Sequence, residues 1–133
     1  MRAFICSRIT SDLSGAALGQ AAMPAPGPGE ALLRIEAAGL NFPDLLMLQG
    51  LYQHKPDPPF IPGMECSGTI AALGPGTDGF ALGDEVIASV RTGAFAEFVC
   101  APAAQLWKKP KGLSFAAAAA IHAAVTSGIF STS

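Results

Sequence analysis

The sequence predicts a mainly β fold with short helices, in which several strands form one compact, partly open β-barrel. Short apolar and alternating segments recur along the chain, and turns rich in glycine and proline separate them. Only short stretches have helical character, so a doubly wound sheet is not indicated. A length of 133 residues is near the usual size of one domain and allows a single core.

The first half of the chain predicts three strands, at residues 2–7, 15–20 and 31–37. A Gly/Pro turn at residues 25–30 precedes the third strand. Leu33 and Ile35 are expected to face the core of the barrel. Arg34 and Glu36 alternate with them and are expected to face water.

A short helix and a stiff loop follow the third strand. Pro43 suits the first turn of a helix because its missing amide proton is not needed there. Residues 44–49 continue this helix, and Gly50 ends it. Residues 54–63 are rich in proline, which excludes regular structure and predicts a surface loop of the kind that often borders a site.

The second half predicts three further strands, at residues 67–73, 85–90 and 94–101. The turn at residues 74–79 reads Gly-x-Gly-x-x-Gly, which is the pattern of a dinucleotide-binding loop. In such a loop the glycines open a helix, whereas residues 80–84 hold another Gly-Asp turn. The segment is therefore predicted to be a hairpin turn.

A second helix is predicted to begin near Ser114, which is a suitable N-cap for the alanine-rich run that follows. Residues 113–133 contain no Asp, Glu, Lys or Arg. Alanine dominates this segment, and Leu, Ile and Phe are sparse, so a helix packed on protein is favoured over a membrane span.

Charge and cysteine content exclude several functional classes. The net charge is −2, and Lys and Arg are scattered apart from a short run at residues 108–111, so nucleic acid is not expected as a partner. The three cysteines are widely spaced and form no Cys-x-x-Cys pair, which favours reduced thiols. A second arginine at position 8 lies where a signal peptide needs its apolar core, and a cytoplasmic location is expected.

Three motifs resemble the zinc-independent branch of the medium-chain dehydrogenase/reductase family, the NADPH:quinone oxidoreductase group. They lie at residues 39–44 (GLNFPD), 49–52 (QGLY) and 60–65 (FIPGME), and the likeness continues through residues 79–84 and 93–98. The resemblance implies a GroES-like catalytic domain over residues 1–112. Residues 113–133 would be a truncated helix that leads toward a cofactor domain, and no Rossmann domain is expected in this chain.

The resemblance also implies roles for three residues. Tyr52 lies where related enzymes have a tyrosine that donates a proton or contacts the nicotinamide, although it can also be a half-buried aromatic that covers the barrel mouth. Asn41 is similar to an asparagine that contacts the nicotinamide ribose, and it can also cap the helix that follows. Thr126 resembles a threonine near the nicotinamide, but a helical threonine often only bonds its own backbone.

Zinc is not expected. In the alcohol dehydrogenase branch a cysteine and a histidine bind the catalytic metal, and those positions hold Asn41 and Met64 here. An amide and a thioether are poor zinc ligands, and His54 and His122 show no ligand spacing. Without a Lewis acid, a hydride is expected to go to an acceptor that is already conjugated, such as a quinone or an enone.

Other polar residues are expected to be structural. Asp44 lies in the first turn of a helix, where a carboxylate is favourable, and Glu65 can orient the backbone or a neighbouring arginine. Cys66 and Cys100 are expected to be buried and inert, and His122 to be packed on its helix.

Three functional readings remain open. The first is the catalytic domain of an NADPH-dependent quinone or enone reductase, inactive as the isolated chain because one wall cannot hold hydride-transfer geometry. The alternatives are an enoyl-thioester reductase and a non-catalytic binding remnant. With Phe115 and Ile121 on its apolar face, the last helix is expected to favour self-association.

Overall fold

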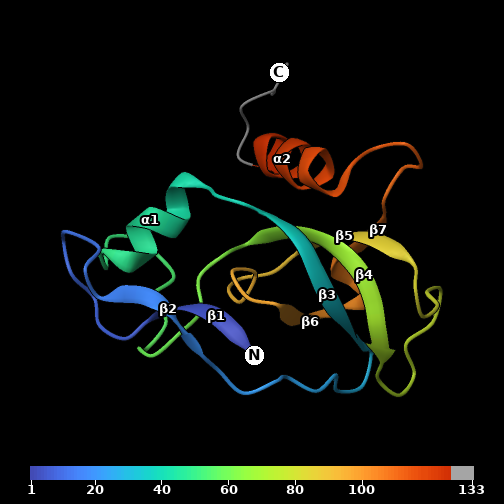
Figure 1. Ribbon diagram of the computed structural model, residues 1–133, viewed down its shortest axis with the longest axis horizontal. Coiled ribbons are helices and arrows are strands. Elements are labelled where there is room, and N and C mark those ends of the chain that lie inside the picture. The colour runs from blue at the N-terminus through green and yellow to red at the C-terminus, as the bar shows by residue number, and fades with distance from the viewer. Residues whose placement is uncertain (127–133) are drawn as a thin grey trace.

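The structure, a computed structural model, describes the backbone of residues 1–126 and the side chains of residues 1–120. It consists of a two-stranded and a five-stranded sheet with two α-helices (Figure 1). All strand pairs in the described residues are antiparallel. The strands are β1 (Arg2–Cys6), β2 (Ala16–Gln20), β3 (Glu30–Gly39), β4 (Glu65–Leu73), β5 (Glu85–Ser89), β6 (Phe98–Pro102) and β7 (Leu106–Lys108).

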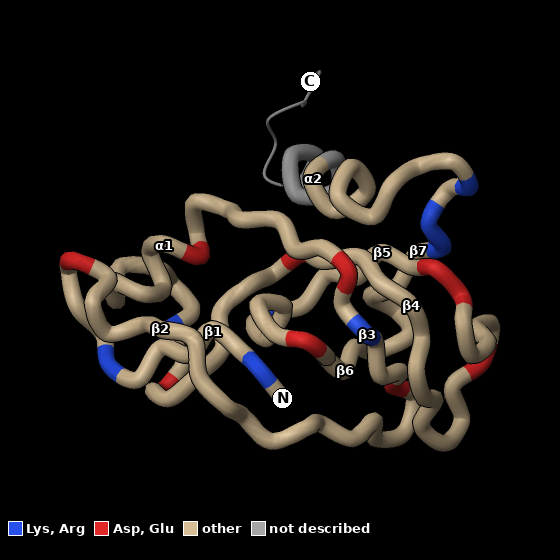
Figure 2. The backbone as a smooth tube through the Cα atoms, viewed as in Figure 1, with Lys and Arg blue, Asp and Glu red and all other residues tan. Residues whose placement is uncertain are grey.

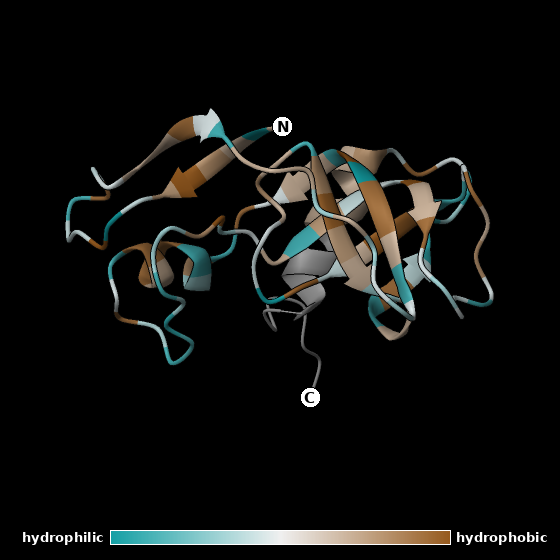
Figure 3. Ribbon diagram, turned by 90° about the horizontal axis from the view of Figure 1, so that it is seen from below, coloured by the Kyte–Doolittle hydropathy of each residue, from teal (hydrophilic) through white to brown (hydrophobic). Residues whose placement is uncertain are grey.

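The large sheet has the strand order β6-β3-β4-β5-β7 and does not close on itself. This confirms the predicted mainly β, partly open architecture. The small sheet, β1-β2, lies beside the large one together with α1 (Phe42–Leu48), as Figure 3 shows. Isolated bridges from Ala3 to Ala96 and from Cys6 to Phe60 connect the small sheet to the rest of the fold.

The burial pattern of β3 matches the predicted alternation. Leu33 is fully buried and Ile35 packs against the same core, whereas Arg34 and Glu36 are exposed. Strands β3 and β4 form the centre of the sheet, with irregularities in register between Leu32 and Leu33 and again after Ile35. Such bulges increase the local twist and help an open sheet to curl.

Two apolar clusters stabilise the fold. The larger one lies within the five-stranded sheet and is made by Ala31, Leu33, Cys66, Ile70, Val86, Ala88, Ala94, Val99, Ala101 and Leu106. A second, smaller cluster links the small sheet to α1 through Cys6, Met47, Leu48 and Phe60. Tyr52 and Met64 are partly buried and pack against this second cluster, which is called the second core below.

The strand predicted over residues 94–101 is only partly correct, because regular pairing begins at Phe98. The preceding residues bind elsewhere: the amides of Ala94 and Phe95 donate to the carbonyls of Gly63 and Pro62, and the carbonyl of Phe95 accepts from Phe4. The segment therefore connects β1 to the 60–65 loop. Strand β7 and the 3-10 turn Ala103–Gln105 before it were not predicted.

Residues 74–79 form part of the connection between the antiparallel strands β4 and β5, which confirms the hairpin and contradicts a phosphate-binding loop. Gly74 is required there by close packing. A Cβ at this position would meet the carbonyl oxygen of Gly27 at 1.9 Å. The amide of Gly74 donates to Glu30 at 2.8 Å, so the turn is held against the start of β3.

Helix α2 (Phe115–Thr126) lies over one face of the five-stranded sheet (Figure 1). Ala118 and Ala119 are both 1% exposed, and small side chains at these positions let the helix approach the sheet closely. The predicted cap is confirmed, because Ser114 Oγ accepts from the amide of Ala117 at 3.0 Å. Part of the helix surface is thus covered by the sheet, and the expected self-association stays a prediction.

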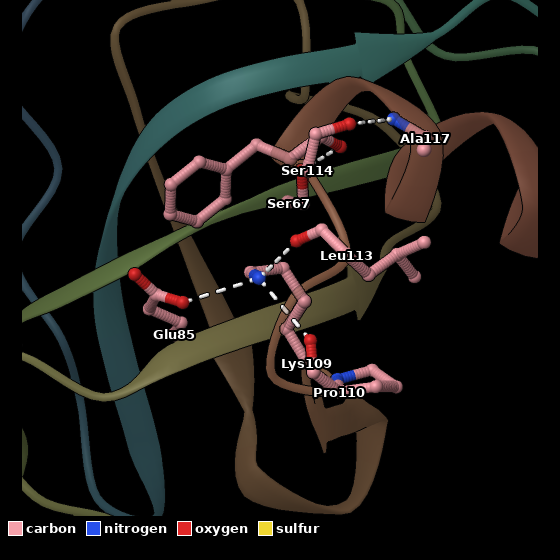
Figure 4. Close-up of polar contacts among 8 residues, drawn as sticks. Ser67, Glu85, Lys109, Pro110, Leu113, Ser114 and Ala117 are labelled. Carbon is pink, nitrogen blue, oxygen red and sulfur yellow. Dashed lines mark hydrogen bonds and ion pairs between the residues drawn. The ribbon is translucent and has the colours of Figure 1, made fainter.

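A buried lysine anchors the segment that leads into α2 (Figure 4). The Lys109 side chain is 5% exposed, and its Nζ pairs with Glu85 Oε1 at 3.1 Å. The same ammonium donates to the carbonyls of Leu113 and Pro110, and it lies 5.1 Å from the ring centroid of Phe115. Ser67 Oγ donates to the carbonyl of Phe115 at 2.5 Å, which ties the first turn of α2 to β4.

Replacing Lys109 by methionine is expected to lower the free energy of unfolding by about 2 kcal/mol, because buried carbonyls lose a charged donor while Glu85 stays half in water. Lys108→Met is the matched control. Lys108 is 67% exposed and reaches Asp84 only at 4.0 Å, so its loss should cost less than about 0.5 kcal/mol. Urea unfolding of both variants measures the difference, and equal losses would show that Lys109 is not an anchor.

Charged residues are spread along the backbone, with one local group of lysines at the end of β7 and just after it (Figure 2). Within residues 1–126, no helix is both long enough and apolar enough to cross a membrane.

Candidate functional site

A cleft of about 360 Å³ lies beside the second core, and it contains one of the three predicted site residues, Tyr52. Met47 comes from α1, Tyr52 and the adjacent polar residues from the loop after it, and Met64 from the segment before β4. Arg91 reaches the cleft from the end of β5. The lining is Met47, Tyr52, Gln53, His54, Met64 and Arg91.

Tyr52 is half-buried, and its ring packs against the second core. Its hydroxyl has no hydrogen-bond partner among the side chains and backbone that the structure describes. The chain positions it through the end of α1, where the amide of Leu51 donates to the carbonyl of Leu46 at 2.8 Å. A supported ring with an unengaged hydroxyl in a cleft is the arrangement that a proton donor needs.

Asn41 lies at the opposite end of α1 and does not line this cleft. It occupies the N-cap position, and its backbone amide donates to Asp44 Oδ2 at 2.8 Å. The amide of Asp44 in turn donates to the carbonyl of Asn41 at 3.0 Å. The backbone of Asn41 therefore takes part in capping the helix, which is the alternative role expected for this residue. A seven-residue helix, about 10 Å long, separates it from Tyr52.

Thr126 is the last residue of α2, and its side chain, like that of His122, lies outside the described residues. Its expected place near the nicotinamide stays a prediction.

The residues around Asn41 fit a nicotinamide group. Leu40 and Phe42 flank it and are 65% and 69% exposed, so a large apolar surface lies beside an amide that both donates and accepts. The expected contact of Asn41 with a nicotinamide ribose stays a prediction.

Two buried carboxyl groups, Asp44 and Glu65, lie between the Asn41 end of α1 and β5. They are 0% and 1% exposed. Burial raises the pKa of Glu65 to about 7, a hydrogen bond from Ser89 Oγ lowers it in part, and the charge of Asp44 raises it further. Burial also raises the pKa of Asp44, against the lowering effect of the amides of Asn41 and Gly63.

These two carboxyl groups are buried in the protein and do not line the cleft. Glu65 pairs in register with Gly39 and Ser89, so it links the strand before α1 to the strand before Arg91. The structural roles expected for Asp44 and Glu65 agree with this placement. The effect of the Asp44 charge on Glu65 and the raised pKa of Glu65 were not predicted, because the two residues are far apart in sequence.

Gly63 lets the chain turn tightly beside Met64. Its φ of +107° is a conformation that other residues rarely adopt, and a Cβ there would meet the backbone nitrogen of Phe95 at 2.7 Å. The amide of Val90 donates to the carbonyl of Met64 at 2.7 Å. Met64 and Arg91 are consequently held side by side at the cleft.

Among the described residues, no group of three or more His, Cys, Asp or Glu side chains is arranged to hold a metal ion. The residues near Asn41 and Met64 offer an amide, a thioether and buried carboxyls, a donor set that does not fit a tetrahedral zinc ion. A site that works without zinc stays a prediction.

None of the three cysteines lines the cleft that holds Tyr52: Cys6 and Cys66 are buried, and Cys100 is half-buried. Burial raises the pKa of Cys66 to about 12 and also raises the pKa of Cys6 and of Cys100, with the charge of Glu65 or Glu30 adding to the effect at Cys66 and Cys100. Thiols in this state are poor nucleophiles, as expected.

Of the six lining residues, the sequence predicts a site role only for Tyr52, and it places His54 and Met64 only in relation to a zinc site that is not expected. Arg91 gave no local signal, because it follows a strand and stands alone between a valine and a threonine. Only the pairing of β4 with β5 brings it to Met64.

Residues 27–111 match the family of alcohol dehydrogenase GroES-like domains. The mouse synaptic vesicle membrane protein VAT-1 homolog-like is 46% identical over 103 residues, which cover 77% of this chain and 25% of that protein. This chain thus spans about a quarter of the length of such curated relatives.

Two solved structures share the fold. The human synaptic vesicle membrane protein VAT-1 homolog-like protein has a TM-score of 0.86 and 42% identity, covering 90% of this chain and 38% of that chain. The quinone oxidoreductase from Thermus thermophilus, solved also in complex with NADPH, has a TM-score of 0.74 and 37% identity, covering 90% and 35%. The chain belongs to the alcohol dehydrogenase GroES-like domain family, and it is similar in sequence and fold to the VAT-1 homolog-like protein and to a quinone oxidoreductase.

Proposed function

We propose that this chain supplies the acceptor-side wall of an NADPH-dependent reductase that reduces a conjugated carbonyl compound, a quinone or an enone, without zinc. The observation that carries the proposal is the Tyr52 hydroxyl, which lies unengaged in a cleft walled by the thioethers of Met47 and Met64. A cleft in which apolar side chains lie beside polar groups that can orient a ligand is typical of a small-molecule site.

NADPH, when bound, would supply a hydride. Conjugation places the electrophilic carbon of an enone two bonds from the carbonyl carbon, and after hydride addition the electron pair ends on the carbonyl oxygen. Tyr52 would donate its proton to that oxygen and regain one from water at the open side of the cleft. The enol formed in this way becomes the saturated ketone by taking a proton from water at the α carbon and releasing the proton on its oxygen to water. The balance is one enone, one hydride and one proton for each saturated ketone formed.

The apolar walls have a defined part in this chemistry. Met64, which is half-buried, offers a flexible, polarisable thioether that adapts to flat rings and chains of different shape, whereas Met47 is 1% exposed and belongs to the second core. Among the residues that the structure describes, no donor set for a Lewis acid lies near them, which supports acceptors that conjugation already activates over simple alcohols and aldehydes.

The test is NADPH consumption by the protein as isolated from its own cells. We expect oxidation of NADPH with a quinone or an enone, no reduction of NADP⁺ with simple alcohols, and no loss of rate after treatment with a zinc chelator. Turnover of alcohols, or loss of activity with the chelator, would contradict the proposal. The same assay on the 133 residues alone checks the expectation that they are inactive without a cofactor domain.

A further inference from the structure

Arg91 is the charged residue of the cleft, and the proton transfer assigned to Tyr52 does not use it. Its side chain is exposed, and within the described residues its guanidinium has no hydrogen bond or ion pair. The two ion pairs found among these residues involve Lys108 and Lys109 instead. An arginine that the fold does not engage is available to a ligand.

Arg91 also lines a second hollow of about 540 Å³, which adjoins the first because Met64 and Arg91 are common to both. No aspartate or glutamate lines either hollow. Asp44 and Glu65 lie behind this surface, fully buried, and do not reach into it. The lining therefore carries an uncompensated positive charge next to apolar walls.

The backbone fixes where this charge lies. Ser89 pairs with Glu65 in the ladder between β4 and β5, and the amide of Val90 donates to the carbonyl of Met64 at 2.7 Å. Arg91 is the next residue, so its Cα is held beside Met64 while its long side chain stays adjustable. Tyr52 and Arg91 thus contribute two different polar groups to one cleft.

We propose that Arg91 is a specificity-determining residue that binds a carboxylate on the acceptor, so that the preferred substrates are quinones or enones that carry an acidic group. A guanidinium binds a carboxylate through two parallel hydrogen bonds, which orients a ligand as well as attracting it. With the carboxylate on Arg91 and the apolar body against Met64, the carbonyl oxygen is directed to Tyr52. This inference rests on the proposed function.

The test compares 3-benzoylacrylic acid with its methyl ester, two enones that differ in the charge at one end. We expect the protein as isolated to reduce the acid with the higher kcat/KM, and Arg91→Met to lower the acid-to-ester ratio by about 10- to 100-fold, the value of a charge-assisted hydrogen bond. The change should lie mainly in KM. Arg91→Lys should restore part of the ratio, and Arg34→Met, an exposed arginine on β3, should leave it unchanged.

Equilibrium dialysis of both compounds without NADPH separates this inference from the proposed function. If neither is reduced, but the acid binds the native protein at least tenfold more tightly than it binds Arg91→Met, the carboxylate site stands and the proposed reaction is wrong. If both are reduced and Arg91→Met leaves the ratio unchanged, the reaction stands and the role of Arg91 is overturned. Equal binding of acid and ester by the native protein also overturns it.

Discussion

Replacing Tyr52 by phenylalanine is expected to lower kcat for an enone by about 100-fold, the lower end of the range for losing a positioned proton donor. KM should change little, because the ring that packs on the second core remains. The fold should also be unaffected, since the hydroxyl has no partner among the described residues. Steady-state kinetics of the native protein and the variant, with unfolding curves of both, measure the effect.

His54 provides the control for this prediction, because it lines the same cleft and is the other side chain there that can donate a proton. His54→Asn is expected to lower kcat much less than Tyr52→Phe does. A large loss in His54→Asn together with full activity in Tyr52→Phe would assign the proton donor to the histidine.

Ionisation of Glu65 is expected to lower the free energy of unfolding by about 3 kcal/mol as the pH rises from about 4 to about 8. Burial raises the pKa of this carboxyl from 4.5 to about 7, and this difference corresponds to about 3 kcal/mol. The folded protein prefers the protonated form. The stability that the protonated Glu65 carboxyl contributes is therefore fully present below the unfolded pKa of about 4.5, and it is lost as the pH rises through the folded pKa of about 7.

Glu65→Gln isolates this effect, because an amide of the same shape does not titrate. Relative to the native protein, the variant should gain about 3 kcal/mol between pH 4 and pH 8 in urea unfolding followed by Trp107, the single tryptophan. The raised pKa of Asp44 acts in the same direction and is present in both proteins. Glu36→Gln, an exposed position on β3, is the control. A constant difference between Glu65→Gln and the native protein would contradict the burial account.

The parts of the fold that follow local rules could be predicted from the sequence. Alternation in β3 placed Leu33 and Arg34 on the correct faces, and Pro43 placed the first turn of α1. The second Gly-Asp turn at residues 80–84, where a dinucleotide-binding loop would begin a helix, correctly predicted a hairpin turn after Gly74. In each case the deciding information lies within a few neighbouring residues.

The parts that depend on pairing between distant segments could not be predicted. Ala94 and Phe95 have strand-forming neighbours, but their amides bind the 60–65 loop instead of a regular strand. The short strand β7 is defined by its antiparallel pairing with the outer edge of β5. Arg91 joins the site for the same reason, since only the ladder between β4 and β5 places it beside Met64.

The candidate site was predicted in part. Tyr52 lines a cleft and Asn41 lies at the other end of α1, and the catalytic role of the first and the cofactor contact of the second stay predictions. Single residues with a characteristic motif around them are visible in a sequence. The raised pKa of Glu65 and the charge of Arg91 in the cleft arise only from burial and from three-dimensional neighbours.

The position of the transferred hydride tests the central claim most directly. The protein as isolated from its own cells would be incubated with an enone and NADPH deuterated at the transferring position, and the product examined by NMR. The account predicts a saturated ketone with deuterium on the carbon β to the carbonyl. Deuterium on the carbonyl carbon, in an allylic alcohol, would contradict it, because that product requires direct activation of the carbonyl.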